Sequence, residues 1–124
     1  MSLIRKAIAL ILLSGASLTP TYAQSTVYVS DALGTDNNAC GGIGTPCKTI
    51  QYAVDTIASA FDTVKIDTGL YQLPATVGVD TPVVNIPEDK SLCFVGTNSG
   101  NGTRIDGDTL RRGFLMRYTG GSCP

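Results

Sequence analysis

A continuous apolar stripe that leads directly into a two-faced strand constrains this chain of 124 residues more than any other feature. Within the segment from residue 46 to residue 71, the apolar side chains between residues 50 and 61 recur at the spacing of one helical face. The stripe consists of Ile50, Ala53, Val54, Ile57, Ala58 and Phe61. Thr49 stands just before the stripe and is the predicted N-cap, although Thr45 followed by Pro46 offers an alternative start. The sequence therefore predicts an amphipathic helix with one face to bury.

The segment after the helix has the alternation of a half-buried strand. Val64 and Ile66 alternate with Lys65 and Asp67, so one face of the strand is expected to join a core while the other meets water. Thr68-Gly69 then predicts a turn.

Several short motifs recur in an order that is typical of one known architecture. They are TVYVS at 26–30, Pro46-x-Lys48-Thr49-Ile50-Gln51-x-Ala53, Gly69-Leu70-Tyr71, KSLCFVG at 90–96 and TRIDGD at 103–108. Together they resemble the N-terminal cap and first coils of right-handed parallel β-helix proteins of the pectin-lyase-like superfamily. The resemblance implies an all-β solenoid, a right-handed parallel β-helix whose open end is covered by the amphipathic helix. Solenoids normally need at least three coils and a cap at each end, and no end cap is visible, so we expect a truncated chain.

The first 23 residues have the organisation of a secretory signal peptide. Arg5 and Lys6 precede an apolar core over residues 7–13, and Thr21-x-Ala23 precedes Gln24, so cleavage is predicted after Ala23. The apolar core is shorter than the roughly 20 residues of a membrane span. Residues 24–124 are expected to form the N-terminal part of one exported domain. The chain has 9 basic and 10 acidic side chains, and cleavage removes two of the basic ones, which argues against nucleic acid as a partner.

The four cysteines are expected to form disulfides, because export leads to an oxidising compartment. We expect Cys40 to pair with Cys47, which would close the Gly-rich loop before the helix, and Cys93 to pair with Cys123 by elimination. A zinc site is the alternative, but the chain has neither histidine nor a Cys-x-x-Cys pair. Two alternatives compete with the second bridge: Cys93 could pair with a cysteine beyond residue 124, or it could remain free.

Histidine is absent, which removes the Ser-His-Asp triad and the Cys-His dyad from these residues. No catalytic residue is assigned. Asp67 and Asp106 each end a cation-isoleucine-carboxylate segment, and if both strands shared a sheet these carboxylates would form a pair able to bind calcium or sugar hydroxyls. Alternating charge on the wet face of a strand is the competing interpretation.

The loop over residues 31–44 concentrates oxygen-bearing side chains that would suit calcium, the only cofactor that the sequence suggests. Asp31, Asp36, Asn37 and Asn38 lie among glycines, but their spacing departs from the EF-hand pattern. Asp and Asn are also ordinary turn residues, so turn formation is preferred and no metal site is assigned.

These features predict a secreted, periplasmic or cell-surface protein that is a non-catalytic adhesion or glycan-binding module. Its partner would be a polysaccharide or a cell-surface glycan. The alternative is a polysaccharide-active enzyme, pectinesterase-like or a calcium-dependent lyase, whose active site lies beyond residue 124. That alternative depends on the resemblance, since many unrelated activities share one fold.

Overall fold

The computed structural model describes residues 15, 23–74, 76–78, 80–97, 102–109 and 111–116. Most of the predicted signal peptide, and Cys123, lie outside this part of the chain. The described residues form a short helical segment and seven strands. These are β1 Thr26–Val29, α1 Ile50–Tyr52 with its π-helical continuation η1 Ala53–Ile57, β2 Thr63–Ile66, β3 Gly69–Tyr71, β4 Val84–Ile86, β5 Cys93–Gly96, β6 Thr103–Ile105 and β7 Phe114–Met116. Across these ranges, no helix has the length and apolar character that a membrane crossing requires.

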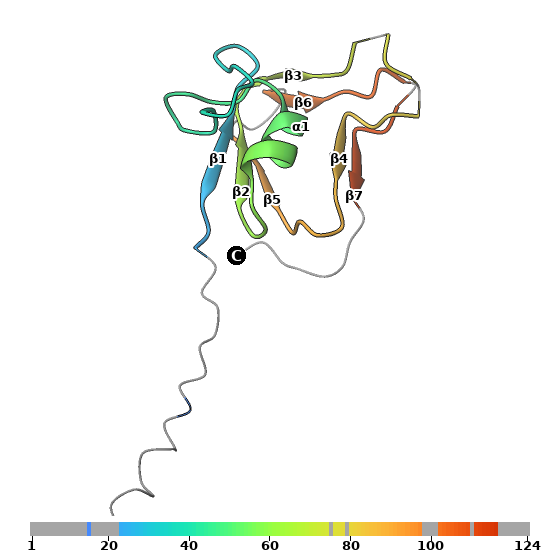
Figure 1. Ribbon diagram of the computed structural model, residues 1–124. Helices are drawn as coiled ribbons and strands as arrows, with labels where there is room; N and C mark the ends of the chain where they lie inside the picture. Colours follow the sequence, from blue (N-terminus) through green and yellow to red (C-terminus); the bar gives the residue numbers. More distant parts are fainter. Residues whose placement is uncertain are drawn as a thin grey trace, which may run out of the picture.

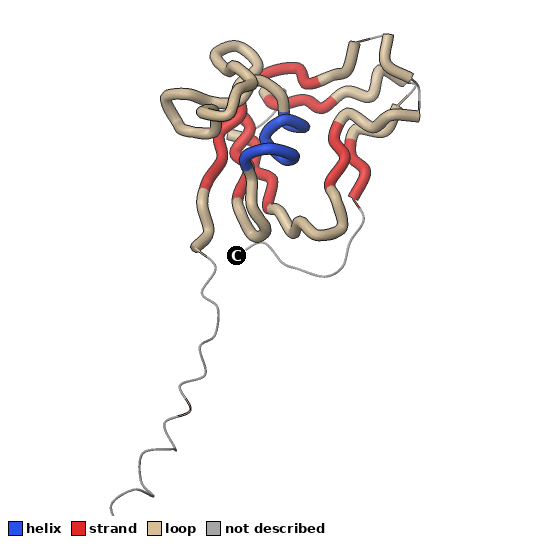
Figure 2. Tube along the Cα trace, in the orientation of Figure 1, coloured by secondary structure: helices blue, strands red, loops and turns tan. Residues whose placement is uncertain are grey.

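The strands form three short parallel sheets around one core (Figure 1). One sheet has the order β1-β2-β5, and the other two pair β3 with β6 and β4 with β7. Parallel neighbours need long connections. The connection from β1 to β2 contains the helical segment, whereas the connections within the pairs β2-β5, β3-β6 and β4-β7 contain strands of the other sheets. Figure 2 shows the helical segment beside this core, between the larger sheet and the β4-β7 pair. Valines dominate the centre, where Val29, Val54, Val64 and Val84 are at most 1% exposed.

The described residues form short parallel sheets rather than a parallel β-helix, which corrects the resemblance to the pectin-lyase-like superfamily. Two of the sheets have only two strands each, the third has three, and the strands are three or four residues long. A solenoid needs about three or more stacked repeats before it buries a continuous core. The wider expectation of a truncated all-β chain stays a prediction.

The helical segment begins where the sequence predicts, but it is shorter and wider than an ordinary α-helix. The side chain of Thr49 accepts a hydrogen bond from Tyr52 N at 3.2 Å, which confirms this residue as the N-cap. The predicted stripe is buried at Ile50, Ala53, Val54 and Ala58, and Ile57 is partly buried against the same core. Phe61 lies beyond the helix, has φ of 72° and is 40% exposed. The apolar stripe therefore predicted a helix that is about one turn longer than the observed one.

The strand after the helix is confirmed, whereas the predicted turn is not. Val64 and Ile66 are buried at 0% and 3% exposure, as their alternation with polar residues requires. Gly69–Tyr71 is strand β3 rather than a turn, because it gains a parallel partner in β6. The chain bends at Thr68 instead.

The helix also completes the edge of another sheet through one side chain. Gln51 Nε2 donates to Asn85 O at 3.1 Å, and Asn85 N donates to Gln51 Oε1 at 2.7 Å. The primary amide therefore satisfies both backbone groups of Asn85 in β4, as a neighbouring strand would. An unpaired strand edge is otherwise open to association with other chains.

We predict that Gln51→Glu lowers the free energy of unfolding by about 0.5–1.5 kcal/mol, the net contribution of a typical hydrogen bond, because the two bonds to Asn85 are exposed. A carboxylate accepts from Asn85 N but cannot donate to Asn85 O, and it faces Asp55, to which the amide of Gln51 donates at 2.8 Å. Urea unfolding monitored by circular dichroism measures the effect. Gln72→Glu is the matched control, since Gln72 is exposed. Equal stabilities of the two variants would contradict the role of the amide.

Candidate functional site

Residues 31–48, called here the disulfide loop, leave β1 and return along its edge. Tyr28 N donates to Gly41 O at 2.9 Å, and Cys47 N donates to Tyr28 O at 2.9 Å. Val29 and Cys47 form an isolated parallel bridge. The loop therefore occupies the position of a neighbouring strand beside β1.

The disulfide between Cys40 and Cys47 is present, as the sequence predicts. The two Cα atoms are 4.9 Å apart, and the residues are 7% and 0% exposed. Cys93 is also disulfide-bonded, while Cys123, its predicted partner, lies outside the described residues. The part of the chain that the structure describes contains no free cysteine.

Two glycines allow the disulfide loop to approach the rest of the chain closely. A Cβ at Gly34 would lie 2.2 Å from Cys47 O, a separation that no side chain tolerates. Gly41 has φ of +106°, and a Cβ there would meet Ile57 at 2.8 Å. Glycine alone adopts such a conformation at little cost, so both positions fix the course of the loop.

The carboxylate of Asp36 joins the loop to the start of the helix. One oxygen accepts from Lys48 N at 2.8 Å and Thr49 N at 3.0 Å, and the other accepts from Thr49 Oγ1 at 2.8 Å. These donors include the backbone amide of the N-cap, one of the groups that a helix start leaves without an internal partner. Asp36 therefore stabilises the helix start together with Thr49.

The side chains of Asp36, Asn37 and Asn38 in the loop accept hydrogen bonds from other groups of the chain. Asn37 Oδ1 accepts from Ala39 N at 2.8 Å, and Asn38 Oδ1 accepts from Tyr52 Oη at 3.0 Å. The donor atoms of Asp36, Cys40 and Cys47 lie within 4.8 Å of one another, but both sulfurs belong to the disulfide. This arrangement fits the turn interpretation of the loop better than a calcium or zinc site.

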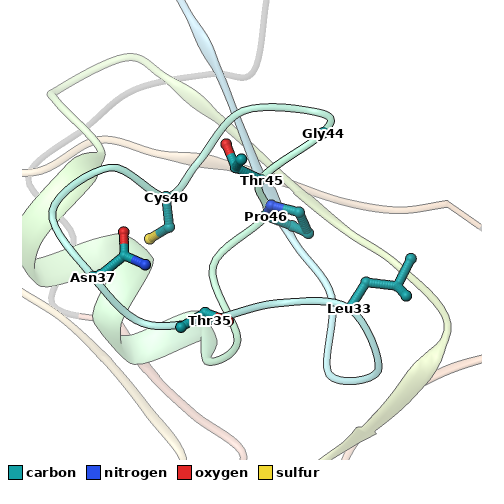
Figure 3. A pocket seen from close by; sticks show the side chains of 7 residues that line it. All are labelled: Leu33, Thr35, Asn37, Cys40, Gly44, Thr45 and Pro46. Atoms are coloured by element: carbon teal, nitrogen blue, oxygen red, sulfur yellow. The ribbon is translucent and has the colours of Figure 1, made fainter.

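A shallow hollow with a volume of about 190 Å³ opens within the loop (Figure 3). It is lined by Leu33, Thr35, Asn37, Cys40, Gly44, Thr45 and Pro46. Leu33 stands at the rim opposite Asn37 and Cys40 in Figure 3, and it is 77% exposed. Ile43, next to Gly44, is 80% exposed. The loop therefore displays two large aliphatic side chains beside a concave surface.

The two carboxylates considered as a binding pair follow strands of different sheets. Asp67 follows β2 in the three-stranded sheet, whereas Asp106 follows β6 in a different sheet. Asp106 pairs with Arg104, whose Nη2 lies 3.0 Å from its carboxylate. The condition for a shared site, that both strands lie in one sheet, is not met.

Asp67 instead belongs to a row of polar residues that the sequence analysis missed. Ser30, Asp67 and Thr97 follow directly after β1, β2 and β5, so the parallel register sets them side by side. Ser30 Oγ donates to Asp67 Oδ2 at 3.4 Å, and Thr97 Oγ1 donates to Asp67 Oδ1 at 3.1 Å. A signal was present in the sequence, because each of these residues directly follows a short segment that contains valine, a residue that favours strands.

Tyr71 connects this row to the disulfide loop. Its hydroxyl donates to Asp67 O at 3.1 Å and accepts from Asp31 N at 3.1 Å, and the residue is 5% exposed. Burial raises the pKa of the Tyr71 hydroxyl, the hydrogen bond from Asp31 opposes that shift, and the charges of Asp31 and Asp67 add to it. The neutral phenol is therefore the form that the fold holds.

Comparisons with protein-family models, with curated proteins and with solved structures find no match. The expected membership in the pectin-lyase-like superfamily consequently has no support from related proteins. Functional inference therefore depends on the residues of the chain itself.

We predict that the double variant Cys40→Ala, Cys47→Ala lowers the free energy of unfolding by about 2–3 kcal/mol, because a closed loop of this length restricts the unfolded chain by about that amount. The two cysteines are 7 positions apart. Urea unfolding under non-reducing conditions measures the change. The double variant Leu33→Ser, Ile43→Ser is the control on the same loop, and it should change stability by less than about 0.5 kcal/mol because both side chains are exposed. A double-alanine variant as stable as the wild type would contradict this role of the disulfide.

The raised pKa of Tyr71 predicts a stability that falls at alkaline pH. The contribution of the neutral Tyr71 hydroxyl to the free energy of unfolding is fully present below the ordinary tyrosine pKa of about 10. It is lost as the pH rises through the higher pKa of the folded state. Tyr71→Phe removes this dependence and, because it also removes two hydrogen bonds, lowers stability near neutral pH by about 1–2 kcal/mol. Urea unfolding of both proteins from pH 7 upward checks the prediction. If the free energies of unfolding of the wild type and Tyr71→Phe fell in parallel above pH 10, the prediction would be wrong.

Proposed function

We propose that this protein is an exported, non-catalytic binding module that contacts a protein surface through its disulfide loop. The observation that carries the proposal is the exposure of Leu33 and Ile43, at 77% and 80%. Ile43 occupies the tip of a turn in which Thr45 N donates to Gly42 O at 3.1 Å. Such positions favour Gly, Asn, Asp and Ser, so an isoleucine there has no evident local structural use.

The fixed conformation of the loop supports a binding role. The disulfide, the bonds to β1 and the Asp36 carboxylate hold the backbone on both sides of the two aliphatic residues. Binding by a preformed loop avoids the entropy cost of ordering it at the interface. The free energy gained from burying Leu33 and Ile43 would therefore appear largely as affinity.

The chemistry of the loop favours a protein partner over a glycan. The hollow of about 190 Å³ is smaller than the roughly 300–1,000 Å³ typical of small-molecule pockets, and its size suits an inserted side chain. Among the tyrosines, Lys65 Nζ lies 5.8 Å from the centroid of the Tyr28 ring and Tyr71 is buried, so neither offers the free aromatic face of a glycan platform. Apolar side chains around a small hollow are typical of contacts between proteins.

The arrangement of the acidic residues supports a non-catalytic role. Asp67 accepts hydrogen bonds from two hydroxyls, and Asp106 is paired with Arg104 in another sheet. The alternative of a polysaccharide-active enzyme gains no support from these residues.

The test is binding of the fluorescently labelled, exported protein to washed cells of its producing organism. We predict that Leu33→Ser, Ile43→Ser weakens binding at least about tenfold, since burial of each side chain is worth about 1.5–3 kcal/mol and 1.4 kcal/mol corresponds to tenfold. Protease treatment of the cells should abolish binding of the wild type. Periodate treatment, which destroys glycans, should leave it intact.

The matched control is the double variant Leu70→Ser, Val95→Ser, which removes two aliphatic side chains that are 43% and 41% exposed outside the loop. It should bind like the wild type. Equal binding by the loop variant and the wild type would overturn the proposal. Binding that survives protease and is lost after periodate would favour a glycan partner.

A further inference from the structure

The beginning of the exported domain is fixed to the core at Ser25. Ser25 N donates to Asp62 Oδ1 at 2.9 Å, and Ser25 O accepts from Thr63 N at 2.9 Å. Asp62 is only 2% exposed, and its second carboxylate oxygen accepts from Ser59 N at 2.8 Å. A buried carboxylate thus anchors the backbone one residue before β1.

The two residues before this anchor are accessible. Ala23 and Gln24 are exposed and belong to no helix or strand. The predicted signal-peptide cleavage falls between them, and a processing enzyme needs an accessible, extended segment of this kind. Cleavage there makes Gln24 the first residue of the exported protein, immediately before the fixed backbone.

We propose that Gln24 is a modification site and that the exported protein begins with a pyroglutamyl residue. The proposal rests on the predicted cleavage after Ala23 and does not depend on the proposed binding function. The unprotonated α-amine of Gln24 attacks the carbonyl carbon of its own side-chain amide, and a C–N bond closes a five-membered lactam. The bond between that carbon and the amide nitrogen breaks, and the nitrogen leaves as ammonia with the proton that the amine gives up. No oxidant, reductant or cofactor is needed.

The local structure is compatible with this reaction. The atoms that react all belong to Gln24, and the peptide bond to Ser25 is unchanged, so Ser25 N still donates to Asp62. Among the described residues, no hydrogen bond holds the side chain of Gln24. The side chain is therefore free to turn back on the amine while the rest of the chain stays folded.

The opposing state is a free, protonated amine at Gln24. A protonated amine has no lone pair and cannot attack the side-chain amide. Cyclisation removes this charge and also closes the chain to aminopeptidases two residues before β1. The two states differ in mass and in amine reactivity, so they are separable by experiment.

The test uses the full-length gene product exported by its native host, with intact mass and N-terminal peptide sequencing by mass spectrometry. Free amines are methylated before analysis, so that cyclisation during ionisation is not mistaken for the modification. We expect most molecules to begin at Gln24, to be lighter by one ammonia and to resist labelling at the terminus. Pyroglutamyl aminopeptidase should then remove the first residue and expose the amine of Ser25 to labelling.

Gln24→Ala is the matched control, because it keeps a small, cleavable junction but has no side-chain amide. It should be cleaved at the same position and carry one labelled α-amine. A wild-type protein that begins with an unmodified, labelled Gln24 would overturn the proposal. Cleavage at any other position would overturn it as well, and the cell-binding measurement would be unaffected by either result.

Discussion

This small structure depends on hydrogen bonds that cover the open edges of strands β1 and β4. Parallel strands of three or four residues contribute few hydrogen bonds, and the first strand of a sheet leaves one edge without a partner. Here the disulfide loop lies against β1, and the amide of Gln51 occupies the edge of β4. Both devices come from the segment between β1 and β2, so a single stretch of chain completes two sheets and also covers the valine core.

Local patterns in the sequence predicted local structure well. The alternation around Val64 and Ile66 identified the buried face of β2, and the position of Thr49 identified the N-cap. The short spacing between Cys40 and Cys47 was sufficient to pair them. Each of these features depends on residues close together in the chain, for which periodicity, capping chemistry and loop closure are direct physical guides.

Features that depend on register between distant strands could not be predicted in the same way. A shared site of Asp67 and Asp106 required their strands to lie in one sheet, but those strands joined different sheets. Gly69–Tyr71 looked like a turn because its strand character arises only from pairing with β6. The hydrogen bonds of Asp36 with Lys48 and Thr49 also span more than ten residues. In each case the deciding partner lies far along the chain.

The candidate binding surface and the structural core of this protein are coupled through shared residues. The backbone that displays Leu33 and Ile43 is the same backbone that pairs with β1, and Asp36 connects it to the helix that covers the core. A partner that binds the loop only in this conformation would therefore stabilise the whole domain through binding linkage. Sequence changes that alter the displayed side chains, by contrast, leave these supporting contacts in place.

The position of the disulfide also has a consequence for the order of folding. All three sheets are assembled from strands that are distant in the chain, and such non-local pairing is slow because loop closure must precede the stabilising contacts. The bond between Cys40 and Cys47 spans a short segment and requires none of those pairings. Oxidation of this cysteine pair can thus prepare a template beside β1 before any sheet exists, and the chain would fold from that template toward the later strands.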